Sequence, residues 1–595
     1  MTTGASSARA PLWHVLVLAG IGLLTFFWVF SQLGASLDLS DEGFYLHSAI
    51  YRRLYAQNFT LFGFVYGPLG QLVGWDLVAY RRLGVLMSAG LAIWLGCRIG
   101  LWLGLGTLRS IMLGLAASAW PFLLFYLWLP TPSYNALALQ SLLLIAIGLV
   151  PRDAQNPQIA LWQGFVIGLG GLLAFMAKPT TALIAGIVVL VFLLVTQPRK
   201  LRAIVVPVVV AAIMMIAAAY YVDGGITNFI ARLQRGVVHA ALLDAGHSVW
   251  SLLRLDAFSM RAVEWLVLLI SCVLVCALTL ATNATPLAFL GLWLILSATF
   301  VVAVILGVGY GSVEYTSSAP LVVLGIPLGA AVAAVIANKH NSFWTTMRPV
   351  LPLVLALAVL PYALAFGTNN IIWYHSALAG AFWLFAALPL VGWIKSPGAI
   401  LPAVSIAQIL VAGLLSIPMA NPYRQLEPLR DQVQVVQVGP AQSPVVASSD
   451  VVRYLAGLKK IAASAGLAAR DPVIDITGRM PGALFALDAT PIGDPWIVGG
   501  YPGSAAMARS ALAAVSCDIL ARAWVLSEPT GIRALAMAEV LPPAFGFVEV
   551  GTVDSPLGEY STRFPQILLR PTGNIADRLS ACEQWKAEAI VQPAL

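Results

Sequence analysis

Long apolar runs divide the sequence, and this pattern limits the fold more than any other feature. A helix needs about 20 mostly apolar residues to cross the roughly 30 Å of hydrocarbon in a bilayer. Composition agrees with such crossings, because 60% of the residues are hydrophobic and only 10% are charged, unlike a water-soluble domain. The sequence therefore predicts a polytopic α-helical membrane protein with thirteen transmembrane helices, near residues 13–32, 83–106, 110–129, 135–150, 160–177, 181–196, 203–221, 262–281, 286–307, 318–337, 349–366, 376–393 and 398–417.

The short loops predict the orientation of the chain, because Lys and Arg gather on the cytoplasmic side of a membrane. The opposite short loops hold a single basic residue, Lys178. Thirteen spans from a cytoplasmic N-terminus place residues 421–595 on the periplasmic or extracellular side of a bacterial inner (plasma) membrane. This orientation rests on alternate loops that carry Arg109, Arg152, Arg199, Lys200, Arg202, Lys339, Arg348 and Lys395.

Residues 421–595 differ in kind from the rest of the chain. Ala-rich helical stretches alternate with the strand-like runs "PVIDIT", "PWIVGG", "AWVLSE", "FGFVEVGTV" and "QILLRP", which predicts an α/β domain with a partly parallel sheet. Cys517 and Cys582 are the only cysteines of this region, and an oxidising compartment would allow them to form a disulfide. We therefore expect a transmembrane catalytic domain over residues 1–420 and an extracytoplasmic α/β domain over residues 421–595.

Two long outer segments, 33–82 and 222–261, hold most of the remaining charge of the membrane half, and each predicts interfacial amphipathic helices. Residues 1–420 contain 19 Lys and Arg against 10 Asp and Glu, whereas residues 421–595 contain 14 against 16. Several of the basic residues lie on the wrong side of the membrane to act as topology signals. Anionic lipid head groups or a phosphate ligand would account for them.

Asp38, Asp41 and Glu42 follow directly after the first span, in a chain that is poor in charge. In one interpretation they form a solvated loop or a helix N-terminus, where acidic side chains favour the helix dipole. In the other, a carboxylate is kept at the membrane surface for chemistry, and partial burial moves its pKa toward the working range of a base. The residues alone leave both interpretations open.

An Asp-Glu-x-x-Tyr sequence just outside the first span, here Asp41, Glu42 and Tyr45, resembles the hallmark of the GT-C superfamily of integral membrane glycosyltransferases. That superfamily includes the protein O-mannosyltransferases and the lipid A aminoarabinose transferases. Further similar stretches are "VYGPLGQL" with Tyr66, Arg81 and Arg82 at the second span, "TPSYNALAL" with Tyr134, and "AKPTTAL" with Lys178. In motifs, the resemblance covers roughly the first 200 residues. One departure is Gly67, which stands before a single proline where the aminoarabinose transferases have a Lys before a proline pair.

The resemblance implies an inverting transfer of a sugar, a hexose or a pentose, from a polyprenyl-phosphate carrier to a glycan, lipid or protein acceptor on the outer face. Asp41 is the expected general base, with Glu42 and Asp38 as the other catalytic candidates. Lys178, Arg81 and Arg82 are candidate contacts of the donor phosphate, and His239 is a weaker one. Tyr45, Tyr66 and Tyr134 are candidate sugar or acceptor contacts. Membrane lipids are expected partners, a nucleic acid is not, and a requirement for a divalent metal ion stays open.

Three other functions compete with this one. A polytopic transporter fits the composition, although it favours charge near the middle of the bilayer and related halves, and neither is visible in the sequence. A ligase or polymerase of lipid-linked glycans has a similar topology and outer arginines, and its donor would be a pyrophosphate-linked oligosaccharide. A non-catalytic assembly protein would leave the three carboxylates without a task.

Overall fold

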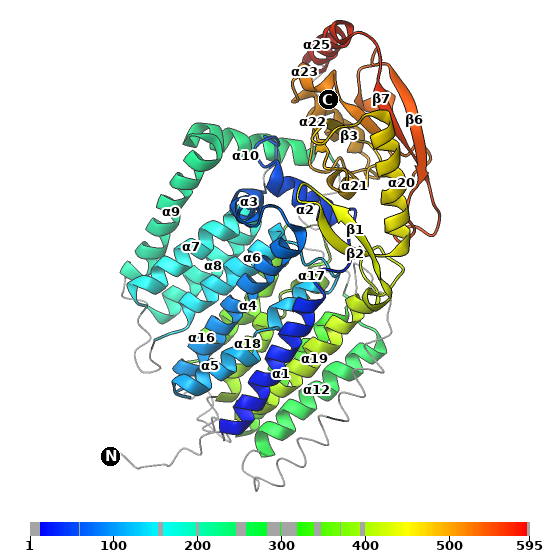
Figure 1. Ribbon diagram of the computed structural model, residues 1–595. Coiled ribbons are helices and arrows are strands. Elements are labelled where there is room, and N and C mark those ends of the chain that lie inside the picture. The colour runs from blue at the N-terminus through cyan, green and yellow to red at the C-terminus, as the bar shows by residue number, and fades with distance from the viewer. Residues whose placement is uncertain are drawn as a thin grey trace, which may run out of the picture.

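The computed structural model confirms the predicted class of fold, a bundle of apolar helices followed by a C-terminal region that contains β-sheets (Figure 1). It describes residues 12–58, 60–152, 159–197, 201–244, 258–281, 298, 318–337, 347–368, 370–392 and 399–591. The bundle and the C-terminal region lie end to end, so the molecule is elongated (Figure 1).

Within the described residues, eight helical segments are long and apolar enough to cross a membrane. They are α1 (Leu12–Ser31), α4 (Leu77–Trp102), α5 (Thr107–Ala116) with the 3-10 turn η1 (Trp120–Phe125), α8 (Pro179–Thr196), α9 (Leu201–Asp223), α12 (Ala262–Leu280), η3 (Ala319–Leu324) with α14 (Gly325–Ala337), and α19 (Ile400–Ala420). Four shorter apolar helices accompany them: α6 (Tyr134–Leu149), α7 (Leu161–Ala177), α16 (Leu351–Ala365) and α18 (Ala381–Gly392). Twelve of the predicted spans thus coincide with apolar helices, whereas the predicted span 286–307 lies almost wholly outside the described residues.

Successive helices run between the two ends of the bundle, which fixes the end at which each loop lies. The backbone N–H of Leu77, at the start of α4, donates to Ser443 Oγ of the C-terminal region at 2.9 Å. α4 therefore begins at the end that carries this region and finishes at the other end. The basic residues Arg109 and Arg152, which follow α4 and α6, lie at that far end.

Three shorter helices cover the end of the bundle nearest the C-terminal region: α2 (Asp41–Ile50), α3 (Phe62–Leu72) and α10 (Ile226–Ala241) (Figure 1). α10 is amphipathic, with Phe229 and His239 buried and Val237 and Val238 exposed. α2 is buried between α3 and the short helix α21 (Pro481–Ala486) of the C-terminal region. The contact is close, since a Cβ added to Gly43 of α2 would lie 2.2 Å from the backbone of Gly482.

The C-terminal region contains a five-stranded sheet in the order β4-β3-β5-β7-β6, together with a separate hairpin. β3 (Pro472–Asp475) pairs in parallel with β4 (Thr490–Pro491) and β5 (Trp524–Ser527), whereas β7 (Pro565–Pro571) pairs antiparallel with β5 and β6 (Phe547–Asp554). The sheet is partly parallel, as the alternating helices and strands predict. The hairpin is formed by β1 (Gln434–Val438) and β2 (Ser443–Ala447), and the helices are α20 (Ser449–Ala465), α21, α22 (Ser504–Ala513), α23 (Cys517–Leu520), α24 (Met537–Val540) and α25 (Ile575–Val591).

The strand predicted over "PWIVGG" is wrong, because residues 495–500 form no strand. The indole N–H of Trp496 donates to the carbonyl of Gly478 at 3.1 Å, and Gly500 has a φ of +88°, so the segment turns instead of pairing. The predicted disulfide is present, since Cys517 at the start of α23 is bonded to Cys582 in α25.

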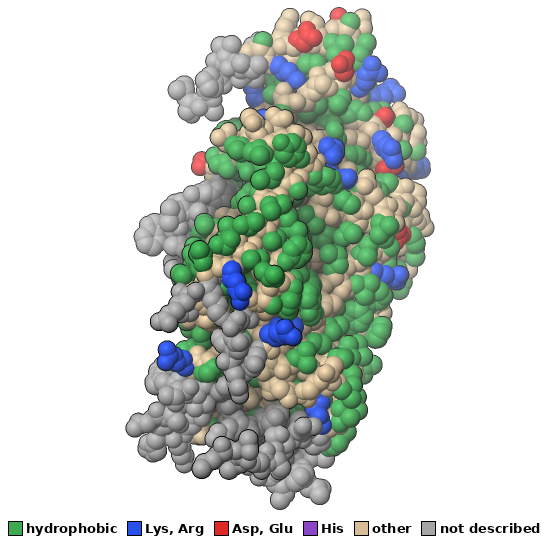
Figure 2. Space-filling view, turned by 90° about the vertical axis from the view of Figure 1, so that its left-hand side faces the viewer, with side chains coloured by type: hydrophobic (Ala, Val, Ile, Leu, Met, Phe, Trp, Pro, Cys, Tyr) green, Lys and Arg blue, Asp and Glu red, His purple; other side chains and the backbone are tan. Residues whose placement is uncertain are grey.

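The hairpin and α21 hold the stretch that carries the three carboxylates. The N–H of Ser36 donates to the carbonyl of Val446 in β2 at 2.8 Å, and the N–H of Gly482 donates to the carbonyl of Leu39 at 2.8 Å. On the face shown in Figure 2, hydrophobic side chains cover most of the bundle, and the acidic side chains lie in the upper half, toward the C-terminal region.

Candidate active site

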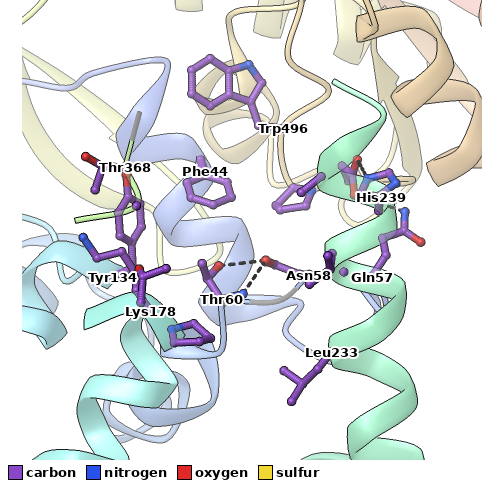
Figure 3. A pocket seen from close by; sticks show the side chains of 18 of the residues that line it. Phe44, Gln57, Asn58, Thr60, Tyr134, Lys178, Leu233, His239, Thr368 and Trp496 are labelled. Carbon is purple, nitrogen blue, oxygen red and sulfur yellow. Dashed lines mark hydrogen bonds and ion pairs between the residues drawn. The ribbon is translucent and has the colours of Figure 1, made fainter. Parts of the chain in front are cut away.

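A cavity of about 570 Å³ lies where the bundle meets the C-terminal region. Its volume is in the range of small-molecule sites. Most of its lining is apolar or aromatic, with polar groups from several elements facing one another across it (Figure 3). The lining residues include Phe44, Gln57, Asn58, Thr60, Tyr134, Phe175, Lys178, Thr180, Leu233, His239, Thr368, Asp494, Pro495, Trp496 and Met507.

Lys178 lies on one side of this cavity, at the junction between α7 and α8. The sharp junction arises because Pro179 begins α8 and cannot continue α7. The ammonium group donates to the carbonyl of Leu364 in α16 and lies 5.7 Å from the ring centre of Tyr134. Within the described residues no carboxylate forms an ion pair with Lys178, and burial lowers its pKa to about 7. An anionic ligand beside it would favour the charged ammonium form.

His239 lies on another side of the cavity, near the end of α10 (Figure 3). Its Nε2 is 2.8 Å from Oδ2 of Asp494, and both side chains are 7% exposed. Oδ1 of Asp494 accepts from the side-chain amide of Gln57 at 3.3 Å. The structure thus brings three of the predicted residues, Lys178, Tyr134 and His239, to a single cavity.

Asp41 is the most exposed of the three carboxylates, with 17% of its side chain accessible. Its carboxylate lies 4.0 Å from the guanidinium of Arg424, which follows α19. Burial raises the pKa of Asp41, and the charge of Glu559 raises it further, while Arg424, the hydroxyl of Tyr423 and Arg533 act in the opposite direction. A base with a raised pKa holds a proton more strongly, which suits general-base chemistry near neutral pH.

Asp41 does not line the cavity. Phe44, three residues later in α2, does. Residues three apart lie on the same side of a helix. Phe44 packs against Tyr134, with 6.4 Å between ring centres. Asp41 therefore lies on the same side of α2 as Phe44, about one helical turn before it.

Glu559 lies within a cluster of charged side chains beside Asp41. Its carboxylate lies 3.3 Å from Arg533, 3.4 Å from Arg424 and 3.5 Å from Arg479. Arg479 also pairs with the buried carboxylate of Glu528 at 2.9 Å. The charged groups around this carboxylate, Arg424, Arg533 and Glu559, therefore all come from the C-terminal region, whereas Asp41 itself belongs to the membrane half.

Asp38 has the role of a cap at the start of α2. Its carboxylate accepts from the backbone N–H of Glu42 at 3.0 Å and of Ser40 at 3.2 Å, and from the Ser40 hydroxyl at 2.8 Å. Burial, together with the nearby Asp41, raises the pKa of Asp38 to about 7. For this carboxylate the helix-start interpretation describes the structure.

Glu42 and Arg81 form a buried ion pair beneath α2. The guanidinium of Arg81 donates to both carboxylate oxygens of Glu42, at 2.6 and 2.7 Å, and the two side chains are 2% and 1% exposed. Thr131 also donates to Glu42, and Arg81 donates to the carbonyls of Leu33, Ala35 and Ser36. Arg81 therefore ties the first span to α4, and its donors point away from the cavity toward these partners.

The remaining predicted residues do not line the cavity. Arg82 is exposed, and its guanidinium lies 5.4 Å from the ring centre of Phe30. Tyr66 is fully buried, and its hydroxyl donates to Gln140 at 2.8 Å. Tyr45 is buried and packs against the rings of Phe62 and Tyr134, so it supports the position of Tyr134 in the cavity lining. Within the described residues, no three His, Cys, Asp or Glu side chains gather as a metal site would require.

The sequence analysis missed the contributions of Asp494, Trp496, Arg424 and Glu559. Trp496 belongs to the stretch "PWIVGG" that resembled a strand, and Asp494 lies just before it. His239 of α10, which contacts Asp494, lies more than 250 residues earlier in the sequence. A usable signal was the pattern Asp-Pro-Trp after a glycine, because Gly493 has a φ of +89° and such a pattern is typical of a turn.

No family model matches the sequence, and no curated protein matches it. Among solved structures, the chain is similar to the crystal structure of ArnT from Cupriavidus metallidurans bound to undecaprenyl phosphate. The two sequences are 14% identical, the match covers 94% of this chain and 98% of that chain, and the TM-score is 0.39.

Proposed function

We propose that this protein is an inverting glycosyltransferase that moves a sugar, a hexose or a pentose, from a polyprenyl-phosphate carrier to an acceptor. The observation that carries the proposal is the position of Lys178, a buried basic side chain in the lining of a largely apolar cavity at one end of a bundle of apolar helices. An anionic group with an attached apolar chain and a sugar matches this lining. Asp41 of α2, about one helical turn from the cavity-lining Phe44, supplies the second requirement, a base.

The reaction needs a base and a group that stabilises the leaving phosphate. Asp41 accepts the proton of the acceptor hydroxyl as its oxygen forms a bond to the anomeric carbon. The bond from that carbon to the phosphate oxygen breaks, and its electron pair stays with the lipid phosphate. The ammonium of Lys178 stabilises the charge that grows there, so it favours the transition state over the ground state. The products are the glycosylated acceptor and the free polyprenyl phosphate.

The other predicted catalytic residues act through Asp41 in this proposal. Asp38 caps the helix that carries Asp41, and Glu42 fixes the same helix through Arg81. Both are positioning residues. Tyr134 remains a candidate contact of the sugar or the phosphate, because it lines the cavity beside Lys178.

A transporter places its binding site near the middle of the bilayer, whereas this cavity is lined by residues of α2, α10 and the C-terminal region. α2 and α10 lie at the end of the bundle nearest that region (Figure 1). The proposed orientation puts the cavity and the C-terminal region, residues 421–595, on the outer side of a bacterial inner membrane. A glycan, lipid or protein on that side is the acceptor. A ligase or polymerase of lipid-linked glycans is distinguished by its donor, which carries a pyrophosphate.

The proposal is tested with purified protein in nanodiscs. Radiolabelled polyprenyl-phosphate sugars serve as donors, and cell-envelope extracts that contain glycans, lipids and proteins serve as acceptors. Transfer from at least one monophosphate donor is expected. Transfer from pyrophosphate-linked oligosaccharides alone would support the ligase or polymerase instead.

Changing Lys178→Ala removes a cation whose partner is charged in both the ground state and the transition state. We expect weaker donor binding together with a turnover reduced by about 10²-fold, because leaving-group charge increases as the bond breaks. The kinetic constants for the donor measure both effects. The exposed Arg82→Ala is the matched control and should leave both constants unchanged, and a Lys178→Ala enzyme with normal turnover would remove Lys178 from the mechanism.

Arg424→Gln and Glu559→Gln should move the pH dependence of transfer in opposite directions. The base must be unprotonated, so activity is lost as the pH falls through the pKa of Asp41. Arg424 lowers this pKa and Glu559 raises it. The acid limb should therefore shift to higher pH in Arg424→Gln and to lower pH in Glu559→Gln, as measured from initial rates across a pH series. Shifts of the same sign in both variants would contradict the assignment of Asp41 as the titrating group.

A further inference from the structure

The C-terminal region supplies part of the cavity that the proposed function assigns to the donor. Asp494, Pro495, Trp496 and Met507 line it opposite residues of the membrane half. In Figure 3, Trp496 lies above the cavity, with Phe44 below it, and Lys178 and His239 are on opposite sides. The cavity is thus incomplete without the loop that contains residues 494–496.

This loop is held in place by buried polar contacts to the membrane half. Asp494 bonds to His239 of α10 and to Gln57. Just before the loop, the carbonyl of Pro491 accepts from the hydroxyl of Tyr55 at 3.1 Å, and Arg232 of α10 donates to the carbonyl of Tyr55 at 2.7 Å. The bonds from Asp494 and Pro491 to the membrane half each span more than 250 residues of sequence, and they fix the loop against α10 and the segment around Tyr55. None of them involves the ring of Trp496.

Trp496 is the aromatic side chain that the loop presents to the cavity. Its indole N–H is bonded to the carbonyl of Gly478, and its side chain is only partly buried. The ring centre of Trp496 lies 6.4 Å from that of Phe44, with the two planes at 51°. The polar edge of the indole is therefore satisfied by the backbone, and Trp496 contributes apolar ring surface to the cavity lining.

The loop is rigid at the point that carries this ring. The carbonyl of Gly478 also accepts from the N–H of Gly499, at 2.9 Å. A Cβ at Gly478 or at Gly499 would lie less than 2 Å from the carbonyl oxygen of Arg533, so only glycine fits at either position. A ring fixed in this way costs little entropy when a ligand binds to it.

We propose that Trp496 is the platform on which the transferred sugar ring stacks, so that the C-terminal region contributes to recognition of the donor. The inference rests on the proposed function. The face of an aromatic ring carries partial negative charge, and the C–H bonds on one face of a sugar are weak donors toward such a surface. With the phosphate at Lys178, a sugar that extends across the cavity meets Trp496 and Phe44. The amide groups of Gln57 and Asn58 in the lining are suited to its hydroxyls.

The experiment compares two ligands that differ only in the sugar: undecaprenyl phosphate, and the undecaprenyl-phosphate sugar that the wild-type protein uses in the transfer assay. Binding is measured with the full chain in nanodiscs. Trp496→Ala should raise the Kd of the sugar-bearing donor by about tenfold and leave the Kd of undecaprenyl phosphate unchanged. Trp496→Phe keeps an aromatic face and should restore most of the donor affinity.

Two further variants keep the test decisive. Trp496→Leu fills the space without an aromatic face, so it reports on stacking if Trp496→Ala fails to fold. Tyr501→Ala changes an exposed aromatic residue of the same segment outside the cavity lining, and it should bind both ligands as the wild type does.

Equal weakening for both ligands would show that Trp496 contacts the lipid and would overturn the inference, as would unchanged donor binding in Trp496→Ala and Trp496→Leu. In either case the transfer activity of the wild type stands, and the proposed function with it. A wild-type protein that transfers from no polyprenyl-phosphate sugar overturns the proposed function, and the inference falls with it.

Discussion

Replacing Asp41 with Asn is expected to reduce turnover by about 10² to 10⁴, the contribution that a positioned general base makes to such a reaction. Asn keeps the shape of the side chain and its capacity to accept hydrogen bonds, but it does not take up the acceptor proton. The donor should therefore still bind, because Lys178 and the cavity are unchanged. Initial rates at saturating donor and acceptor measure the loss, and binding of undecaprenyl phosphate checks the fold.

Asp38→Asn is the matched control for this change. Asp38 caps α2 through acceptor bonds that an Asn side-chain oxygen also provides, so its loss should cost less activity than that of Asp41. Rates in Asp41→Asn equal to those of the wild type would remove Asp41 from the mechanism. An inactive Asp38→Asn protein beside an active Asp41→Asn protein would move the role of base to Asp38.

Breaking the ion pair between Arg81 and Glu42 should have the largest effect on stability. Arg81→Met leaves the carboxylate of Glu42 buried without its cation, which typically costs about 3 to 5 kcal/mol. We expect a large fall in the melting temperature of the purified protein and a lower yield of folded protein. Combining Arg81→Met with Glu42→Leu removes both charges, and it should recover much of the loss because no unpaired charge remains.

This pair of variants also separates two roles for Arg81. The sequence motif suggested that Arg81 contacts the donor phosphate, whereas in the structure its donors are directed to Glu42, Thr131 and three backbone carbonyls. A melting temperature unchanged in Arg81→Met, together with weaker binding of undecaprenyl phosphate, would favour the phosphate contact and contradict the structural role.

The apolar runs predicted the helices of the bundle well because this part of the fold is encoded locally. A segment in hydrocarbon must satisfy its own backbone hydrogen bonds, so about 20 apolar residues specify a helix without reference to the rest of the chain. The same holds for the junction at Lys178, where Pro179 separates two helices. The pairing of Cys517 with Cys582 was also predictable, because these are the only cysteines of the C-terminal region.

The division of roles among Asp38, Asp41 and Glu42 was not predictable from their spacing. All three lie within five positions, and their environments come from distant segments: Arg81 for Glu42, and Arg424 with Glu559 for Asp41. A change of one residue rotates a helical side chain by about 100°. Adjacent carboxylates therefore face different neighbours, and only the packing of those neighbours decides which one is paired and which one stays accessible.

The sequence by itself determined the membrane-spanning class, the order of the helices and the acidic motif at the start of α2, since each depends on neighbours along the chain. Only the tertiary structure decided that residues 495–500 form no strand and that residues 494–496 complete the cavity beside His239. Contacts between residues hundreds of positions apart depend on how whole elements pack. Such contacts leave no repeating pattern in the sequence of either segment. A single buried hydrogen bond, such as that from His239 to Asp494, requires only one suitable residue in each segment.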